Sequence, residues 1–218
     1  MNPKSLCAFV GLIVLSVLSG GCQSAYYGAM EKMGVHKRDI LVDRVESAKN
    51  AQEDAKEQFV STFDQFVSVS GVEVSELKKS YDSLQKKYDA SEAAATDVID
   101  RISGIRSVAE ALFKEWGNEL DIYSNEDLRK ASEAQLDATK ELYAKLMVSM
   151  EEVSNRMTPV LEAFRDQTLF LKHNLNAQAI SALNQTSMSL EAEVEELIAQ
   201  METSINEAND FIEQMREG

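Results

Sequence analysis

Apolar and polar residues alternate at helical spacing along most of this chain, and the clearest pattern lies between Val74 and Ile122. In this segment one series of residues repeats every seven positions, and a second series follows it four positions later. The first series is Leu77, Leu84, Ser91, Val98, Ile105 and Leu112, and the second is Tyr81, Tyr88, Ala95, Ile102, Ala109 and Trp116. All except Ser91 are apolar or aromatic, which predicts one long helix, roughly 75 Å in length, with a coiled-coil seam or a bundle-facing stripe.

Three further segments show the same spacing of apolar residues, and each predicts an amphipathic helix. The first begins at Asp39, and its apolar face contains Leu41, Val45, Ala48, Ala55, Phe59, Phe63 and Phe66. The second follows Asn125 and contains Leu128, Ala131, Ala138, Leu142, Leu146, Met150, Val153, Met157, Val160 and Phe164. The third follows Asn176 and contains Leu183, Leu190, Val194, Leu197, Met201, Ile205, Ala208, Ile212 and Met215.

Residues typical of turns and helix caps separate the first three helices. The segment Ser68–Glu73 contains a glycine, and Ser70 is available to cap the helix that follows. Gly117–Asn118 is the start of the second interruption, after which Ser124 or Asn125 is expected to cap the third helix. Acidic residues in the first turn of that helix would suit its positive end.

Two features complicate the second half of the chain. Pro159 lacks the amide hydrogen that a helix interior uses, so we expect a kink or a short break near Met157, with Thr158 as a cap. The two asparagines of His173–Asn176 favour a turn because asparagine tolerates left-handed backbone, and a continuous helix is the alternative.

These patterns predict an all-α fold with about four long helices, each of about 40 to 50 residues. Short connections place neighbouring helices antiparallel, so we expect an elongated antiparallel helical bundle or two packed coiled-coil hairpins. A three-helix packing with the N-terminal helix detached is a further alternative. The pattern shows no internal repeat of the kind that builds a solenoid.

The first residues have the three-part layout of an export signal: a charged start at Met1–Lys4, an apolar run at Leu6–Leu18, and small residues before Cys22. The sequence Leu18-Ser19-Gly20-Gly21-Cys22 resembles the lipobox of bacterial lipoprotein precursors, although leucine stands one position earlier than usual. We therefore expect a signal peptide over residues 1–21 and a lipid on Cys22. An uncleaved transmembrane helix is the alternative, and a plain signal peptide with an incidental cysteine is another.

Lipid on Cys22 would anchor the protein to a membrane without a transmembrane span. By resemblance to the sorting rule of Gram-negative lipoproteins, Gln23 after the cysteine favours the periplasmic face of the outer membrane, with the inner membrane as the alternative. Residues 22–36 would then form the lipidated N-terminus and a short tether, and residues 37–218 the helical bundle domain.

Composition and charge exclude several classes of function. The net charge of −15 argues against nucleic-acid binding, which requires a clustered basic surface. The cysteines are Cys7 and Cys22, so no disulfide can hold the later domain together. The histidines are His36 and His173, and neither belongs to a Glu-x-x-His pair. Phosphate-binding loops, zinc motifs and hydrolase motifs do not occur either, so we expect no catalytic residues, no metal, no cofactor and no enzymatic activity.

Five basic residues are candidate contacts for lipid or for a partner. His36, Lys37 and Arg38 form a basic cluster near the expected anchor, where they could meet lipid phosphates. Arg165 and Lys172, seven residues apart, would project from one face of a helix in a stretch that also holds a proline, two aromatic residues and two asparagines. This stretch is either an element that binds a partner or defines a turn, or simply a kinked helix followed by an ordinary connection.

Three segments carry a resemblance to a known family: Tyr26-Tyr27-Gly28, Val35-His36-Lys37-Arg38-Asp39-Ile40-Leu41, and Thr158–Ala177. With them the chain resembles the DUF2959 family of uncharacterised, lipoprotein-like proteobacterial proteins over nearly its whole length after the signal. The resemblance brings no activity and no functional residues. We expect a non-enzymatic envelope lipoprotein with a structural or scaffolding role, which binds a protein partner or itself through its helices. The alternative is a membrane-active or lipid-binding helical bundle.

Overall fold

The computed structural model describes Met30 and residues 35–217 of the 218-residue chain. The predicted signal peptide, Cys22 and most of the predicted tether therefore lie outside the described residues. Four long helices make up nearly all of the described chain: α3 (Lys37–Ser68), α4 (Leu77–Leu120), α5 (Glu126–His173) and α6 (Ala177–Glu217). Two short 3₁₀ helices, η1 (Val69–Gly71) and η2 (Val74–Glu76), connect α3 to α4, and the described residues form no strand.

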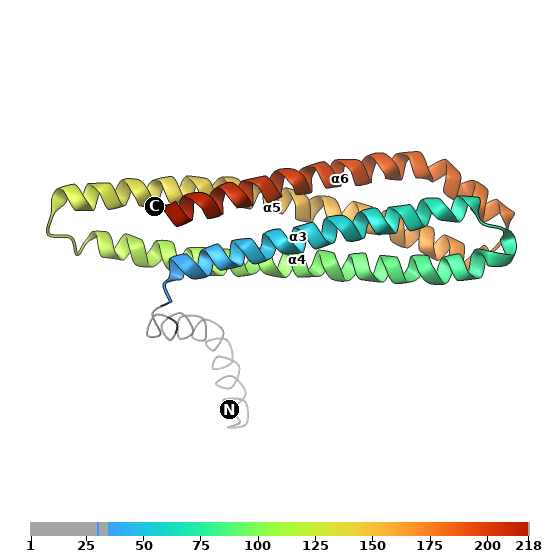
Figure 1. Ribbon diagram of the computed structural model, residues 1–218, viewed down its shortest axis with the longest axis horizontal. Helices are drawn as coiled ribbons and strands as arrows, with labels where there is room; N and C mark the ends of the chain where they lie inside the picture. Colours follow the sequence, from blue (N-terminus) through green and yellow to red (C-terminus); the bar gives the residue numbers. More distant parts are fainter. Residues whose placement is uncertain (1–29, 31–34, 218) are drawn as a thin grey trace, which may run out of the picture.

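The four helices form one elongated antiparallel bundle (Figure 1). α3 packs against both α4 and α6, and α5 also packs against both, so each helix has two neighbours. The prediction of an all-α helical bundle is confirmed, and residues of all four helices share one continuous apolar core. A detached N-terminal helix is ruled out because residues of α3 such as Leu41, Val45 and Phe59 are fully buried in that core.

Helix length is the first departure from expectation. α4, α5 and α6 have 44, 48 and 41 residues, as expected, but α3 has only 32. At 1.5 Å per residue α4 measures about 66 Å rather than 75 Å, and α5 about 72 Å. The molecule is thus a rod in which α4 and α5 are longer than the helices that cover them.

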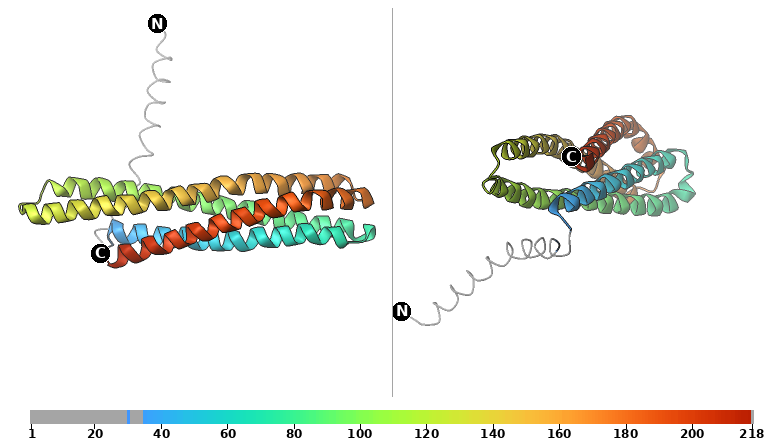
Figure 2. Two further views of the ribbon diagram at one scale, coloured as in Figure 1. Left: turned by 90° about the horizontal axis from the view of Figure 1, so that it is seen from above. Right: turned by 60° about the vertical axis from the view of Figure 1, so that its left-hand side comes forward.

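One end of the rod is therefore built from two helices only (Figure 1 and Figure 2). Near its first residue α3 is level with Glu115 of α4, because Lys37 pairs with Glu115, and the end of α6 lies beside Arg38. Between the buried residues Leu112 and Leu136 no described residue is buried. We call residues 113–135 the overhang.

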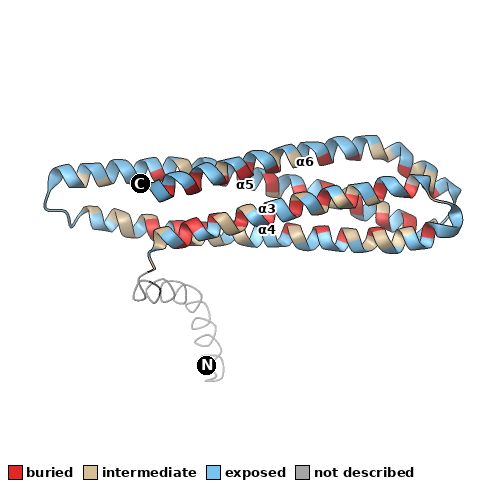
Figure 3. Ribbon diagram, viewed as in Figure 1, coloured by how far each residue is buried: buried red, intermediate tan, exposed pale blue. Residues whose placement is uncertain are grey.

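The overhang explains an error in the predicted core. Leu128, Ala131 and Ala138 were predicted on the apolar face of α5, but all three are exposed. Leu128 and Ala131 lie in the overhang, which α3 and α6 do not reach, whereas Ala138 lies beyond it, between the buried residues Leu136 and Thr139, and faces away from the core. The first buried residues of α5 are instead Leu136 and Thr139. Further along α5 the predicted stripe is correct from Leu146 onward, and buried residues face the interior of the rod (Figure 3).

The connection between α3 and α4 differs from prediction. α4 begins at Leu77, after η2, and its N-cap residue Glu76 makes no side-chain cap hydrogen bond. Ser70 lies within η1, six residues before that cap, so the prediction that Ser70 caps α4 is wrong. Gly117–Asn118 also fails to interrupt α4, which continues to Leu120 because neither residue is a strong enough helix breaker at a largely exposed position.

The other two connections lie where they were predicted, but only the cap at Asn125 forms for the predicted reason. Asn125 is the N-cap of α5, and its Oδ1 accepts hydrogen bonds from the backbone N–H groups of Asp127 at 2.9 Å and Leu128 at 3.1 Å. At the far end, Asn174 Nδ2 donates to the carbonyl of Phe170, and Asn176 Oδ1 accepts from the backbone N–H of Ala179. Asn174 has a φ of −131°, so this turn uses side-chain capping and not left-handed backbone at that residue.

Pro159 does not break α5, which is continuous through it. Of the predicted alternatives near Met157, a kink or a short break, the break is therefore wrong, and so is the predicted cap at Thr158. Proline deprives the carbonyl four residues earlier of its donor, and that residue is Asn155. Both Asn155 and Pro159 are exposed, so water can hydrate this carbonyl and the helix can continue.

Candidate functional site

The predicted basic cluster lies at the N-terminus of α3 and is used mainly inside the bundle. Lys37 Nζ lies 3.0 Å from Glu115 Oε1 of α4, and its side chain is only 10% exposed. Arg38 Nε donates a 2.9 Å hydrogen bond to the backbone carbonyl of Met215, in the last turn of α6. These two cations fasten α3 to α4 and α6, whereas His36 is exposed. Contact of the cluster with lipid phosphates stays a prediction.

A cleft of about 460 Å³ lies beside this cluster, where the start of α3 meets the overhang. Its lining combines apolar and charged side chains from the two helices: His36, Lys37, Arg38, Leu112, Glu115, Trp116 and Glu119. Trp116 Nε1 also donates to Ser132 Oγ at 2.8 Å, which joins α4 to α5 within the overhang.

Arg165 and Lys172 lie toward the opposite end of the rod, in the last part of α5. Both are exposed, and Arg165 Nε lies 3.5 Å from Asp166 Oδ1. The structure therefore does not bring the five predicted contact residues together. It divides them between the two ends of the bundle. Partner binding by Arg165 and Lys172 stays a prediction.

The end of the overhang presents a surface that sequence reasoning missed. We call residues 121–128 the tip. Ile122 is 79% exposed, Leu128 58% and Tyr123 42%. The missed signal is the pair Ile122–Tyr123, two large apolar residues in a helix connection that is otherwise polar. Large apolar side chains are usually withdrawn from water, and three exposed ones in one short segment make the tip a candidate contact surface.

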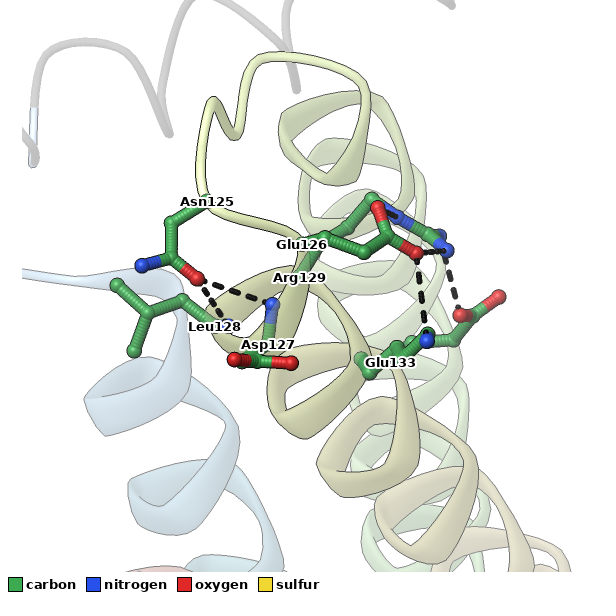
Figure 4. Close-up of polar contacts among 7 residues, drawn as sticks. Asn125, Glu126, Asp127, Leu128, Arg129 and Glu133 are labelled. Carbon is green, nitrogen blue, oxygen red and sulfur yellow. Dashed lines mark hydrogen bonds and ion pairs between the residues drawn. The ribbon is translucent and has the colours of Figure 1, made fainter.

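Polar contacts cap and brace the first turns of α5 at the tip (Figure 4). Beside the Asn125 cap, Arg129 Nη2 donates to Glu126 Oε1 at 2.8 Å, and Arg129 Nη1 donates to Glu133 Oε2 at 3.1 Å. The hydrogen bond from Arg129 lowers the pKa of the Glu126 carboxyl, and the same bond raises the pKa of the Arg129 guanidinium. This ion-pair cluster lies on one side of α5 and the Leu128 side chain on the other (Figure 4).

The interior of the bundle holds two polar side chains without partners among the described residues. Gln52 of α3 and Ser204 of α6 are both 0% exposed, and neither the Gln52 amide nor the Ser204 hydroxyl makes a hydrogen bond there. Within residues 35–217 no group of His, Cys, Asp or Glu side chains is placed to hold a metal ion. In the same part of the chain, none of the helices is both long and apolar enough to span a bilayer.

Comparison with known proteins gives one match. A family model described as "Protein of unknown function (DUF2959)" matches residues 26–215. No curated protein and no solved structure gave a significant match to the chain.

Proposed function

Because this chain belongs to the DUF2959 family, whose description assigns no activity, we propose a function from its own residues. We propose that it is a lipoprotein held at a membrane by lipid on Cys22, with a non-enzymatic structural or scaffolding role. Gln23 after the cysteine favours the periplasmic face of the outer membrane.

The observation that carries this proposal is the position of the start of α3 on the elongated bundle. α3 follows the segment that contains Cys22 in the sequence, and α3 begins at the end of the rod where the overhang begins. A lipid on Cys22 would hold this end within a tether's length of the bilayer. The rod would then present about 70 Å of charged helix surface to a protein partner or to a second copy.

The charged surface suits reversible contacts with partners. Many of its ions pair across helices, as in Arg106 with Glu151 at 2.5 Å and Arg156 with Glu196 at 2.7 Å. Exposed pairs of this kind add little to stability, so their main effect is to set the charge pattern that a partner meets.

Palmitate labelling and membrane fractionation test the anchor. We expect wild type to incorporate label and to sediment with the outer membrane, and Cys22→Ala to lose both properties. A Cys7→Ala variant is the matched control, because its cysteine lies in the predicted signal and its loss should leave labelling intact. Unlabelled wild-type protein, or a Cys22→Ala variant that stays in the membrane, would contradict the anchor.

Crosslinking tests the scaffolding role. We expect crosslinked envelopes from wild-type cells to yield a reproducible partner, or a dimer of this chain, and we expect the yield to fall in Cys22→Ala cells at equal protein level. Recovery of neither a partner nor a dimer would contradict this role.

A second candidate is a membrane-active or lipid-binding bundle that opens at a bilayer. The observation that favours it is the pair of unpartnered polar side chains, Gln52 on α3 and Ser204 on α6, because these two helices pack together and buried unpaired groups weaken a seam. A liposome leakage and lipid-transfer assay separates the candidates. Inactivity in both assays would remove this one.

A further inference from the structure

We propose that the tip of the overhang is a second membrane contact, which places Ile122, Tyr123 and Leu128 in the headgroup region of a bilayer rich in ethanolamine lipid. This inference rests on the proposed anchor and adds to it. The anchor alone would leave the rod free to swing, whereas a second contact would fix which end and which face meet the membrane.

The first argument is the exposure of apolar side chains at the end of the rod. Ile122, Leu128 and Tyr123 are 79%, 58% and 42% exposed. No described helix covers them, since α3 begins and α6 ends beside the inner end of the overhang. Tyrosine is favoured at membrane interfaces because its ring is apolar and its hydroxyl is polar. These side chains gain a less aqueous environment only if something outside the described chain covers them.

The second argument is geometry, which favours a bilayer as the occupant. The chain from Cys22 to Val35 is 13 residues long (35 − 22) and can span at most about 45 Å. It joins α3 level with Glu115, and from there α4 continues for five residues to Leu120, about 8 Å, before the connection turns at the tip. A lipid on Cys22 can therefore lie in the same bilayer that the tip touches.

The third argument is charge, which selects the lipid. Glu126 of the tip lies 2.8 Å from Arg129 Nη2 and 3.8 Å from Lys130 Nζ, so the nearest cations lie beside a carboxylate. The carboxylates of Asp121 and Asp127 flank the apolar side chains and are exposed. A carboxylate can accept hydrogen bonds from the primary ammonium group of ethanolamine lipid, which the quaternary ammonium of choline lipid cannot donate, and it is repelled by a strongly anionic surface.

The preset shape of the tip supports a specific contact rather than loose adsorption. The Asn125 cap fixes the first turn of α5, and the bond from Trp116 to Ser132 joins the two helices of the overhang. A preformed surface loses little conformational entropy on binding, so a small apolar area can suffice beside a lipid anchor.

The test uses full-length lipidated protein in vesicles of phosphatidylethanolamine and phosphatidylcholine. An environment-sensitive fluorophore is attached to Ile122→Cys or to Met188→Cys, and quenching by lipids labelled in the headgroup or upper chain is measured. Met188 is the matched control because it is also 79% exposed but lies near the other end of the rod, in α6. We expect several-fold stronger quenching at position 122, and weaker quenching at position 122 in vesicles rich in phosphatidylglycerol.

Flotation of the same samples separates the two proposals. Protein that floats with the vesicles but shows equal quenching at both positions would overturn the tip contact and leave the anchor intact. Protein that does not float would overturn both. A fluorophore at position 122 that changes only with protein density, and not with lipid quencher, would show that a second copy covers the tip, and this too would overturn the inference.

Discussion

The buried amide of Gln52 allows a quantitative test of how the core is built. The side chain is 0% exposed, and neither Nε2 nor Oε1 has a hydrogen-bond partner among the described residues. A buried amide without partners costs about 1–3 kcal/mol. Methionine is unbranched and of similar length, so Gln52→Met should remove this cost without leaving a cavity. We expect the free energy of unfolding to rise by about 1–3 kcal/mol.

The measurement is urea and thermal unfolding followed by far-ultraviolet circular dichroism, on unlipidated protein that carries Cys22→Ser. For a domain of this size 1 kcal/mol shifts the Tm by about 2–4 °C, so Gln52→Met should raise it by roughly 2–12 °C. The slope of the unfolding free energy against urea concentration should not change, because the variant exposes nearly the same surface area on unfolding as wild type does.

Gln58→Met is the matched control on the same helix. Gln58 Nε2 donates to Thr62 Oγ1 at 3.1 Å and to the backbone carbonyl of Lys87 at 3.1 Å, and methionine would lose both bonds. We expect this variant to be destabilised by about 1 kcal/mol. If Gln52→Met also lowers stability, the Gln52 amide is satisfied in solution, for example by buried water, and the reasoning is refuted.

Two further variants test local features. Asn125→Ala should destabilise the protein by about 1 kcal/mol because α5 loses its cap, whereas Ser124→Ala, the alternative cap position, should have almost no effect in the same unfolding assay. Burial raises the pKa of the Tyr88 hydroxyl above its ordinary value of 10.0. The contribution of this group to the free energy of unfolding is therefore complete below pH 10.0 and is lost as the pH rises through the higher pKa of the folded state. The urea midpoint should fall more steeply above pH 10.0 in wild type than in Tyr88→Phe, and equal slopes would contradict this assignment.

The repeating positions of α4 and α6 could be read correctly from the sequence. All nine apolar positions predicted for α6, from Leu183 to Met215, are buried. In α4 the series from Leu84 to Leu112 is buried, and even Ser91 lies in the core, where its hydroxyl lies 2.8 Å from Thr62 Oγ1. Helical periodicity puts such residues on one face whatever the partner is, so the pattern alone predicts their burial.

Local chemistry also predicted the cap at Asn125 and the position of the turn at His173–Asn176, although the side-chain bonds of Asn174 and Asn176 were not foreseen. Ser70, which has the same capping ability, is not used because η1 and η2 delay the start of α4 to Leu77. A sequence shows which residues are able to cap a helix. The start of the helix depends on how the chain reaches its next packing position.

Only the tertiary structure determines which residues of the helical pattern are covered by another helix. The apolar stripe of α5 is continuous in sequence, yet Leu128 is exposed and Leu146 is buried, because neither the start of α3 nor the end of α6 reaches the overhang. Likewise, Lys37 resembles a free surface cation in the sequence, but its ion pair with Glu115 places it inside the bundle. Periodicity is local and sets the direction of each side chain, whereas burial depends on the lengths and offsets of helices distant in sequence, which are fixed only when the four helices pack.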